Sequence, residues 1–208
     1  MRIVFFGDSI TDAGRNREDE MSLGRYGYGF VHDVSSTLMY QEPNKYQIYN
    51  RGIGGNRSID LYARIKNDLW NLQPDLISLY VGVNDLWHEI KYKNGLEVER
   101  FEKIYKMILD DTLKVLPNVK FILVSPYVMN GTRTSDEIEK FREVDKYEKV
   151  IEKIAKEYDL PLVKLQPVLN EYAKKYGDEY ITFDGIHPNI TGARIIAEEW
   201  LKVFNKNK

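Results

Sequence analysis

Apolar residues gather in five short runs along the chain, each rich in aliphatic or aromatic side chains. The runs are IVFF (3–6), YQIYN (46–50), DLISLYVG (75–82), KFILVS (120–125) and LPLVKL (160–165). Short apolar runs bounded by longer, more polar segments are typical of strands that are buried on both faces of a sheet. The pattern therefore predicts five buried strands.

The longer segments between these runs carry apolar residues at helical spacing. Two such sets lie within residues 98–115 and 138–158, where they recur every three or four positions. A last helix is predicted over residues 191–204, with Thr191 as its cap and Trp200 on its apolar face. Alternating strands and helices predict a parallel sheet between two layers of helices. This is a three-layer α/β/α sandwich of flavodoxin-like type, whose ligands bind beyond the C-terminal ends of the strands.

The length and charge of the chain limit its organisation and its partners. We expect the 208 residues to form one domain, residues 1–208. The net charge of -2 gives no electrostatic reason to expect nucleic acid or an anionic membrane as a partner. No apolar run approaches the ~20 residues of a membrane-spanning helix. A small molecule is therefore the expected partner.

The chain has no cysteine, which excludes a disulfide framework, a thiolate nucleophile and a cysteine-based metal site. The first apolar run begins almost at Met1, and this leaves no room for a signal peptide. We therefore expect a cytoplasmic protein. The 15 tyrosines are compatible with a homo-oligomer, because aromatic residues are enriched at subunit interfaces.

Ser9 is a candidate nucleophile because it follows the first strand directly, in the segment FFGDSITD (5–12). The alternative is that Ser9 caps a helix or turn. A serine hydroxyl needs an adjacent base to act as a nucleophile. The chain has three histidines, and His187 is preceded at turn spacing by a carboxylate, Asp184. The Asp184 carboxylate could hold the His187 ring at Nδ1, while the other ring nitrogen, Nε2, takes the proton of Ser9.

Each of these interpretations has a structural alternative. Asp184 could serve only as a cap in a structural turn, and His187 could pack against its neighbours without a catalytic role. Of the other two histidines, His32 is expected on a helix and His88 at the edge of the cleft, and both are less favoured as the base than His187.

Two further segments could supply hydrogen-bond donors to an oxyanion, the charged oxygen of a tetrahedral intermediate. NRGIGGNRS (50–58) follows the second predicted strand and contains Gly55, and GVND (82–85) follows the third and contains Asn84. Backbone amides and a side-chain amide at one sheet edge, together with the Ser9 N–H, would form such a hole. The glycine-rich segment could instead cradle a phosphate, but it matches neither nucleotide-binding pattern. Asn84 could be an ordinary turn residue.

Together these segments resemble the four blocks of the SGNH/GDSL hydrolase family, in the family's order. The blocks are GDS (7–9), NRGIGG (50–55), GVND (82–85) and DGIHP (184–188). The resemblance implies the flavodoxin-like fold and an ester hydrolase that needs no cofactor and no metal. It implies Ser9 as nucleophile, His187 as base, Asp184 as the orienting carboxylate, and Ser9, Gly55 and Asn84 as oxyanion donors.

Finer features resemble the branch of acetyl-xylooligosaccharide esterases and carbohydrate deacetylases, which implies an acetylated sugar as the substrate. Trp87 is expected either at the mouth of the cleft or in the core. Arg57 is expected on a substrate hydroxyl or bracing Asp85, and Asp8 in contact with substrate. We expect the segment that follows Ser9 to form a loop over the site. This segment contains Arg15, Arg17, Tyr26 and Tyr28.

The alternatives are a lysophospholipase, thioesterase or aryl esterase of the same family, a carbohydrate-binding relative without activity, and an acyltransferase.

Overall fold

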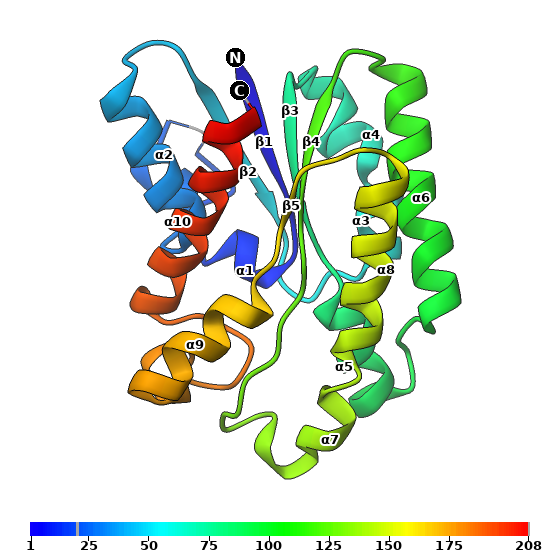
Figure 1. Ribbon diagram of the computed structural model, residues 1–208. Coiled ribbons are helices and arrows are strands. Elements are labelled where there is room, and N and C mark those ends of the chain that lie inside the picture. The colour runs from blue at the N-terminus through cyan, green and yellow to red at the C-terminus, as the bar shows by residue number, and fades with distance from the viewer. Residues whose placement is uncertain (20, 208) are drawn as a thin grey trace.

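The predicted strands form one parallel sheet in the computed structural model, which describes residues 1–19 and 21–207 (Figure 1). The strands lie in the order β2-β1-β3-β4-β5, and every neighbouring pair is parallel. The prediction of a parallel sheet is confirmed. The strands are β1 (Arg2–Gly7), β2 (Gln47–Gly52), β3 (Leu76–Tyr80), β4 (Lys120–Val124) and β5 (Leu162–Val163).

Helices cover both faces of the sheet, which explains why β1 and β3 are apolar on both sides. The helices α2 and α10 lie against one face, and α3, α4, α6 and α8 lie against the other (Figure 1). The α-helices are α1 (Ser9–Asp12), α2 (Phe30–Gln41), α3 (Ser58–Ala63), α4 (Ile65–Asp68), α5 (Val83–Tyr92), α6 (Val98–Val115), α7 (Ile138–Phe141), α8 (Val144–Glu157), α9 (Gln166–Tyr176) and α10 (Ile190–Asn207). Short 3-10 helices are η1 (Leu23–Tyr26), η2 (Trp70–Leu72), η3 (Ser135–Glu137) and η4 (Asp178–Tyr180).

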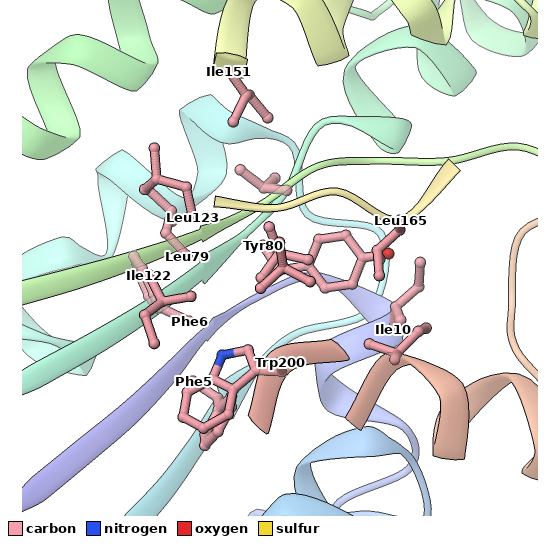
Figure 2. Packing of buried hydrophobic residues seen from close by; sticks show 14 of the residues in the cluster. Phe5, Phe6, Ile10, Leu79, Tyr80, Ile122, Leu123, Ile151, Leu165 and Trp200 are labelled. Carbon is pink, nitrogen blue, oxygen red and sulfur yellow. The ribbon is translucent and has the colours of Figure 1, made fainter. Parts of the chain in front are cut away.

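The core between the sheet and α10 is built from large aromatic side chains. Trp200 of α10 packs against Phe5 of β1 with ring centroids 5.0 Å apart (Figure 2). Its indole N–H donates to Ser78 Oγ of β3 at 2.9 Å, so the buried polar group of this side chain is paired. Burying such large apolar surfaces is the main stabilising contribution in a sheet of this kind. Trp200 therefore ties the last helix to the two central strands.

The strand order places a switch point between β1 and β3. From β1 the chain crosses to β2 on one side, and it then returns to β3 on the other side. At such a point the loops after the two central strands diverge and leave a crevice beyond their C-terminal ends. Ser9 follows β1 and Asn84 follows β3. The topology therefore brings these two residues to the same edge of the sheet.

Beyond shifts of one to three residues at the ends of elements, three features differ from the predictions. The fifth strand has two residues because β5 is an edge strand that pairs with β4 only at Leu162 and Val163. The helical pattern of 138–158 is divided between α7 and α8. The cap of α10 is Asn189 rather than Thr191, since the Asn189 side chain accepts from two backbone N–H groups of its first turn, at 2.9 and 3.0 Å. Within the described residues, we find no helix with the length and apolar character to cross a membrane.

Candidate active site

Ser9 is the first residue of α1, and its hydroxyl is not used as a cap. The cap is Asp8, whose Oδ1 accepts from the N–H of Ile10 at 3.0 Å. Ser9 Oγ instead lies 2.8 Å from Nε2 of His187, at hydrogen-bond distance. The capping alternative for Ser9 is therefore wrong.

The Asp184 carboxylate closes a turn and also orients the His187 ring. Its Oδ1 accepts from the backbone N–H groups of Ile186, at 3.0 Å, and His187, at 2.7 Å. Its Oδ2 lies 2.7 Å from His187 Nδ1. The turn is anchored in the core by Tyr127, whose buried hydroxyl donates to the Ile186 carbonyl at 2.7 Å. With Nδ1 held by the carboxylate, Nε2 is left to face Ser9.

Asp184 is ionised at neutral pH despite its surroundings. Burial by itself opposes ionisation, but the hydrogen bonds from the His187 ring and from the two backbone N–H groups outweigh it and lower the pKa of Asp184 below its ordinary value. A carboxylate that stays charged beside the ring can stabilise the imidazolium that forms when His187 takes a proton.

The loop after β2 presents Gly55 toward Ser9. Gly55 has φ +80°, a left-handed conformation that favours glycine. A Cβ at this position would meet no protein atom within 4 Å, so the backbone conformation and not crowding explains the glycine. The loop is held by Asp12, whose Oδ2 accepts from Gly54 N–H at 3.0 Å. Within the described part of the chain, neither Ser9 N–H nor Gly55 N–H donates to another protein group.

Asn84 lies in the first turn of α5, and its side-chain amide faces the same loop. Its Nδ2 donates to the Asn56 carbonyl at 3.0 Å. A side-chain amide carries two N–H groups, so the second remains available to a ligand. Asn84 is therefore more than a turn residue, because it both braces the loop and lines the pocket.

A pocket of about 220 Å³ brings most of the predicted residues together. Trp87 lies in its wall, as predicted, and also packs edge-on against Phe141 at 5.7 Å. His88 lies in the wall as well. The pocket is lined by Ser9, Gly55, Asn84, Trp87, His88, Tyr92, Arg133 and His187.

Sequence reasoning missed two lining residues, Arg133 and Tyr92. Arg133 belongs to the long loop after β4, and its guanidinium lies over the Trp87 ring, 5.7 Å from the ring centroid. Its Nε is 3.5 Å from Asp184 Oδ2. Neither residue belongs to a recognisable motif. The only signal for Arg133 was its place after a strand, at the C-terminal edge of the sheet.

The structure does not bring Arg57 to the pocket. Its guanidinium forms two bonds with the Asp60 carboxylate, at 2.9 and 3.1 Å, and two with Asn94, through the backbone carbonyl and the side-chain oxygen. It does not brace Asp85 either, because Ser58 does so through its N–H and its hydroxyl. Both expectations for Arg57 are corrected: it lies just beyond the loop but points to α3 and to the end of α5.

The loop after α1 packs beside β2 and does not line the pocket. Arg15 donates to the Gly52 carbonyl, Arg17 pairs with Asp12, and the Tyr26 carbonyl accepts from the Asn50 amide. These contacts order the nucleophile turn from the side of β2. Tyr28 of the same loop is exposed and is also absent from the pocket wall. The expected loop over the site is therefore not observed.

Asp8 is fully buried and absent from the pocket wall, so the expected contact with substrate is not observed. Burial raises the pKa of Asp8 to about 7, against the opposing effects of the Ile10 N–H bond and of His187. An aspartate in an unfolded chain has a pKa of ~3.9. Between these values the folded protein keeps a proton that the unfolded chain releases, so stability falls as pH rises through this range.

Replacing Asp8 with asparagine should flatten this pH dependence, because an amide does not titrate in this range. The amide oxygen can still accept from the Ile10 N–H and cap α1. From pH 5 to pH 8 the free energy of unfolding should fall by about 2–3 kcal/mol less in Asp8→Asn than in the wild type. Denaturant titrations at the two pH values measure this difference. The exposed carboxylate variant Glu139→Gln serves as a control, and an equal fall in Asp8→Asn and wild type would contradict the prediction.

His32 and His88 both lie outside the serine–histidine–aspartate arrangement. His32 is on α2, as expected, and is half-exposed beside Asp33. His88 packs edge-on against Tyr92, and burial together with the nearby Arg57 charge lowers its pKa. Among residues 1–19 and 21–207, no three His, Asp or Glu side chains are grouped as ligands for a metal ion.

A parallel α/β sheet that carries a hydrogen-bonded serine, histidine and aspartate at its C-terminal edge is the arrangement of a class of serine hydrolases. The sequence model of the GDSL-like lipase/acylhydrolase family matches residues 5–195. The chain belongs to this family and is a carboxylic ester hydrolase.

Relatives extend over nearly the whole chain. An acetylxylan esterase of Geobacillus stearothermophilus is 33% identical in an alignment of 205 positions that covers 97% of this chain and 92% of that protein. A GDSL-like protein from Parabacteroides merdae has a similar structure, with a TM-score of 0.93 and 31% identity over 98% of this chain and 95% of its own. LAE5, an α/β hydrolase enzyme from the metagenome of Lake Arreo, has a TM-score of 0.87 and 29% identity, over 98% of this chain and 94% of its own.

Proposed function

We propose that this esterase removes acetyl groups from a soluble acetylated oligosaccharide, through an acyl-enzyme formed on Ser9. The observation that carries the proposal is the continuous chain of hydrogen bonds from Ser9 Oγ to His187 Nε2, and from His187 Nδ1 to Asp184. This is the arrangement that a serine needs in order to lose its proton as it attacks an ester carbonyl.

In the first half of the reaction, Ser9 Oγ attacks the carbonyl carbon while His187 Nε2 takes the hydroxyl proton. The carbonyl oxygen becomes an oxyanion, which accepts hydrogen bonds from Ser9 N–H, Gly55 N–H and the free N–H of the Asn84 amide. His187 then gives its proton to the leaving alcohol, and the acyl group stays on Ser9. Donors fixed in advance stabilise this charge without reorganising during the reaction.

In the second half, water replaces the alcohol. His187 takes a proton from the water, the resulting hydroxide attacks the acyl carbon, and the same donors hold the second oxyanion. The proton then returns to Ser9 Oγ as the acid leaves. Asp184 remains ionised throughout and stabilises each imidazolium.

The size and lining of the pocket support a small acyl group on a polar alcohol. Its volume is about 220 Å³, below the usual range of about 300–1,000 Å³ for sites that enclose a drug-sized ligand. The aromatic rings of Trp87 and Tyr92 and the donors of Arg133 line its wall, and such surfaces suit a sugar. The acetylxylan esterase of G. stearothermophilus, similar over 97% of this chain, supports the same substrate class.

An ester panel tests the proposal. The purified protein should release acetate from acetylated xylo-oligosaccharides with a higher kcat/KM than it cleaves octanoyl esters, a lysophospholipid or aryl esters of longer acids. Preference for the longer acyl chains would overturn the acetyl assignment. Transfer of the acetyl group to an added sugar in place of water would identify an acyltransferase.

Replacing Asn84 with alanine should lower turnover about 10²–10³-fold, because one donor to the oxyanion is lost while Ser9 and His187 keep their contact. The KM for p-nitrophenyl acetate should change much less. Steady-state kinetics measure both constants, and a thermal unfolding midpoint close to that of the wild type would show that the loss is not misfolding. A loss of less than threefold in kcat would remove Asn84 from the oxyanion hole.

A further inference from the structure

Arg64 is a largely buried arginine just outside the pocket, at the junction of α3 and α4. Its side chain is only 14% exposed, and it is absent from the pocket wall. Long charged side chains are rarely buried unless their donors are paired. The hydrogen-bond partners of the Arg64 guanidinium therefore show which parts of the structure it holds together.

The guanidinium donates to three acceptors in two segments at the C-terminal edge of the sheet. Nη2 donates to the carbonyl of Gly7, at the end of β1, at 2.9 Å. Nη1 donates to the carbonyl of Arg51, near the end of β2, also at 2.9 Å. Nε donates to Asn56 Oδ1, in the loop that contains Gly55, at 2.7 Å. One rigid, planar group therefore links the strand that leads to Ser9 with the loop that presents Gly55.

Two further contacts hold the guanidinium itself in place. Nη1 also bonds to Asp68 Oδ2 of α4 at 2.7 Å, in a pair that is mostly shielded from solvent. The Phe6 ring lies beneath the group, with its centroid 4.5 Å from the guanidinium carbon. An arginine that is both paired and stacked is fixed in orientation as well as in position.

The network continues from Asn56 to Asn84, whose side-chain amide is another donor of the oxyanion hole. The side chain of Asn56 accepts from Arg64, and its carbonyl accepts from Asn84 Nδ2 at 3.0 Å. The position of Asn56 therefore affects both the neighbouring Gly55 N–H and the orientation of the Asn84 amide. A displacement of this loop by a fraction of an ångström would weaken the stabilisation of the oxyanion, which depends steeply on donor geometry.

We propose that Arg64 is a positioning residue that sets the Gly55 and Asn84 donors relative to Ser9 through its bonds to Gly7, Arg51 and Asn56. This inference rests on the proposed function, because it assumes that Ser9 carries the acyl group. It assigns Arg64 no contact with substrate and no proton transfer. Its effect is on the transition state, where the oxyanion exists, and not on the binding of the uncharged ester.

Kinetics of Arg64→Met and Arg64→Lys test this inference. With p-nitrophenyl acetate, kcat should fall about 10–100-fold in Arg64→Met and somewhat less in Arg64→Lys, while KM changes less than about threefold. Methylboronic acid, which forms a tetrahedral adduct on serine, should bind more weakly by a similar factor. Unchanged kcat and unchanged methylboronic acid affinity in a folded variant would overturn the proposal.

Arg2→Met is a matched control. Arg2 also donates to a backbone carbonyl and to a side-chain amide oxygen, at Leu72 and Gln47, but at the opposite edge of the same sheet. The Arg2→Met variant should have a lower free energy of unfolding than the wild type but an unchanged kcat. A loss of kcat in Arg2→Met equal to that in Arg64→Met would reduce the role of Arg64 to general stability and would contradict the proposal.

If Arg64→Met does not fold, Asn56→Ala tests the same network with the arginine in place. It should lower kcat and methylboronic acid affinity together, and normal values for both would overturn the proposal. The proposed function fails on a different result, which is full turnover in Ser9→Ala.

Discussion

Replacing Ser9 with alanine is expected to lower the turnover number for p-nitrophenyl acetate by about 10⁴–10⁶-fold, the range seen when a serine hydrolase loses its nucleophile. The physical reason is that no other hydroxyl lies in contact with His187 Nε2, within the residues described, to form the acyl-enzyme. The fold should be retained, because among the described residues the removed oxygen bonds only to His187, and α1 is capped by Asp8. Steady-state kinetics and the thermal unfolding midpoint measure the two effects.

The double variant Ser9→Ala/His187→Ala should be no slower than Ser9→Ala alone, since the two residues act as one unit. Ser36→Ala is a suitable control, because Ser36 is a serine of α2 whose hydroxyl donates to the local Asp33 carbonyl. Turnover of Ser9→Ala within tenfold of the wild type would refute the acyl-enzyme mechanism.

Replacing Asp184 with asparagine should lower turnover by about 10⁴-fold while leaving the turn largely intact. The side-chain oxygen can still accept from the N–H groups of Ile186 and His187, as Asp184 Oδ1 does. The amide nitrogen, however, is a donor where Oδ2 was an acceptor. It would favour the tautomer of His187 with the proton on Nε2, which cannot take the proton of Ser9.

The measurement for Asp184→Asn is kcat at pH 8, together with labelling of Ser9 by an organophosphonate probe, which should slow in parallel. Asp136→Asn, in η3, is the control for loss of a carboxylate elsewhere. If Asp184→Asn retained more than a tenth of wild-type turnover, the carboxylate would not be required to orient His187.

The sheet was predictable because β1, β3 and β4 are buried on both faces, and a strand with two buried faces is a continuous apolar run. The length of β5 was not, because Leu160 and Leu165 of LPLVKL are apolar but lie outside the register with β4. Pairing depends on tertiary geometry, which hydrophobicity does not encode. For the same reason, the pattern over 138–158 did not reveal the break between α7 and α8.

The candidate site was predictable where chemistry and backbone constraint coincide in a few adjacent residues, as they do around Asp184 and His187. The structure places these two side chains together with Ser9, while their catalytic roles remain predictions. Arg133 could not be found in this way, because a long loop brings it to the pocket without any motif. Arg57 shows the opposite error: it is adjacent to the loop in sequence, but Asp60 holds its side chain elsewhere.

The hydrogen bond between Ser9 and His187 joins residues 178 positions apart in the chain. A contact of such separation closes late when a chain folds, because the entropy of a very long loop is lost in forming it. The nucleophile turn can thus be complete while the base is still absent. Ester hydrolysis would then report the docking of α10 and its preceding turn, and recovery of activity after dilution from denaturant would follow, not precede, formation of the sheet.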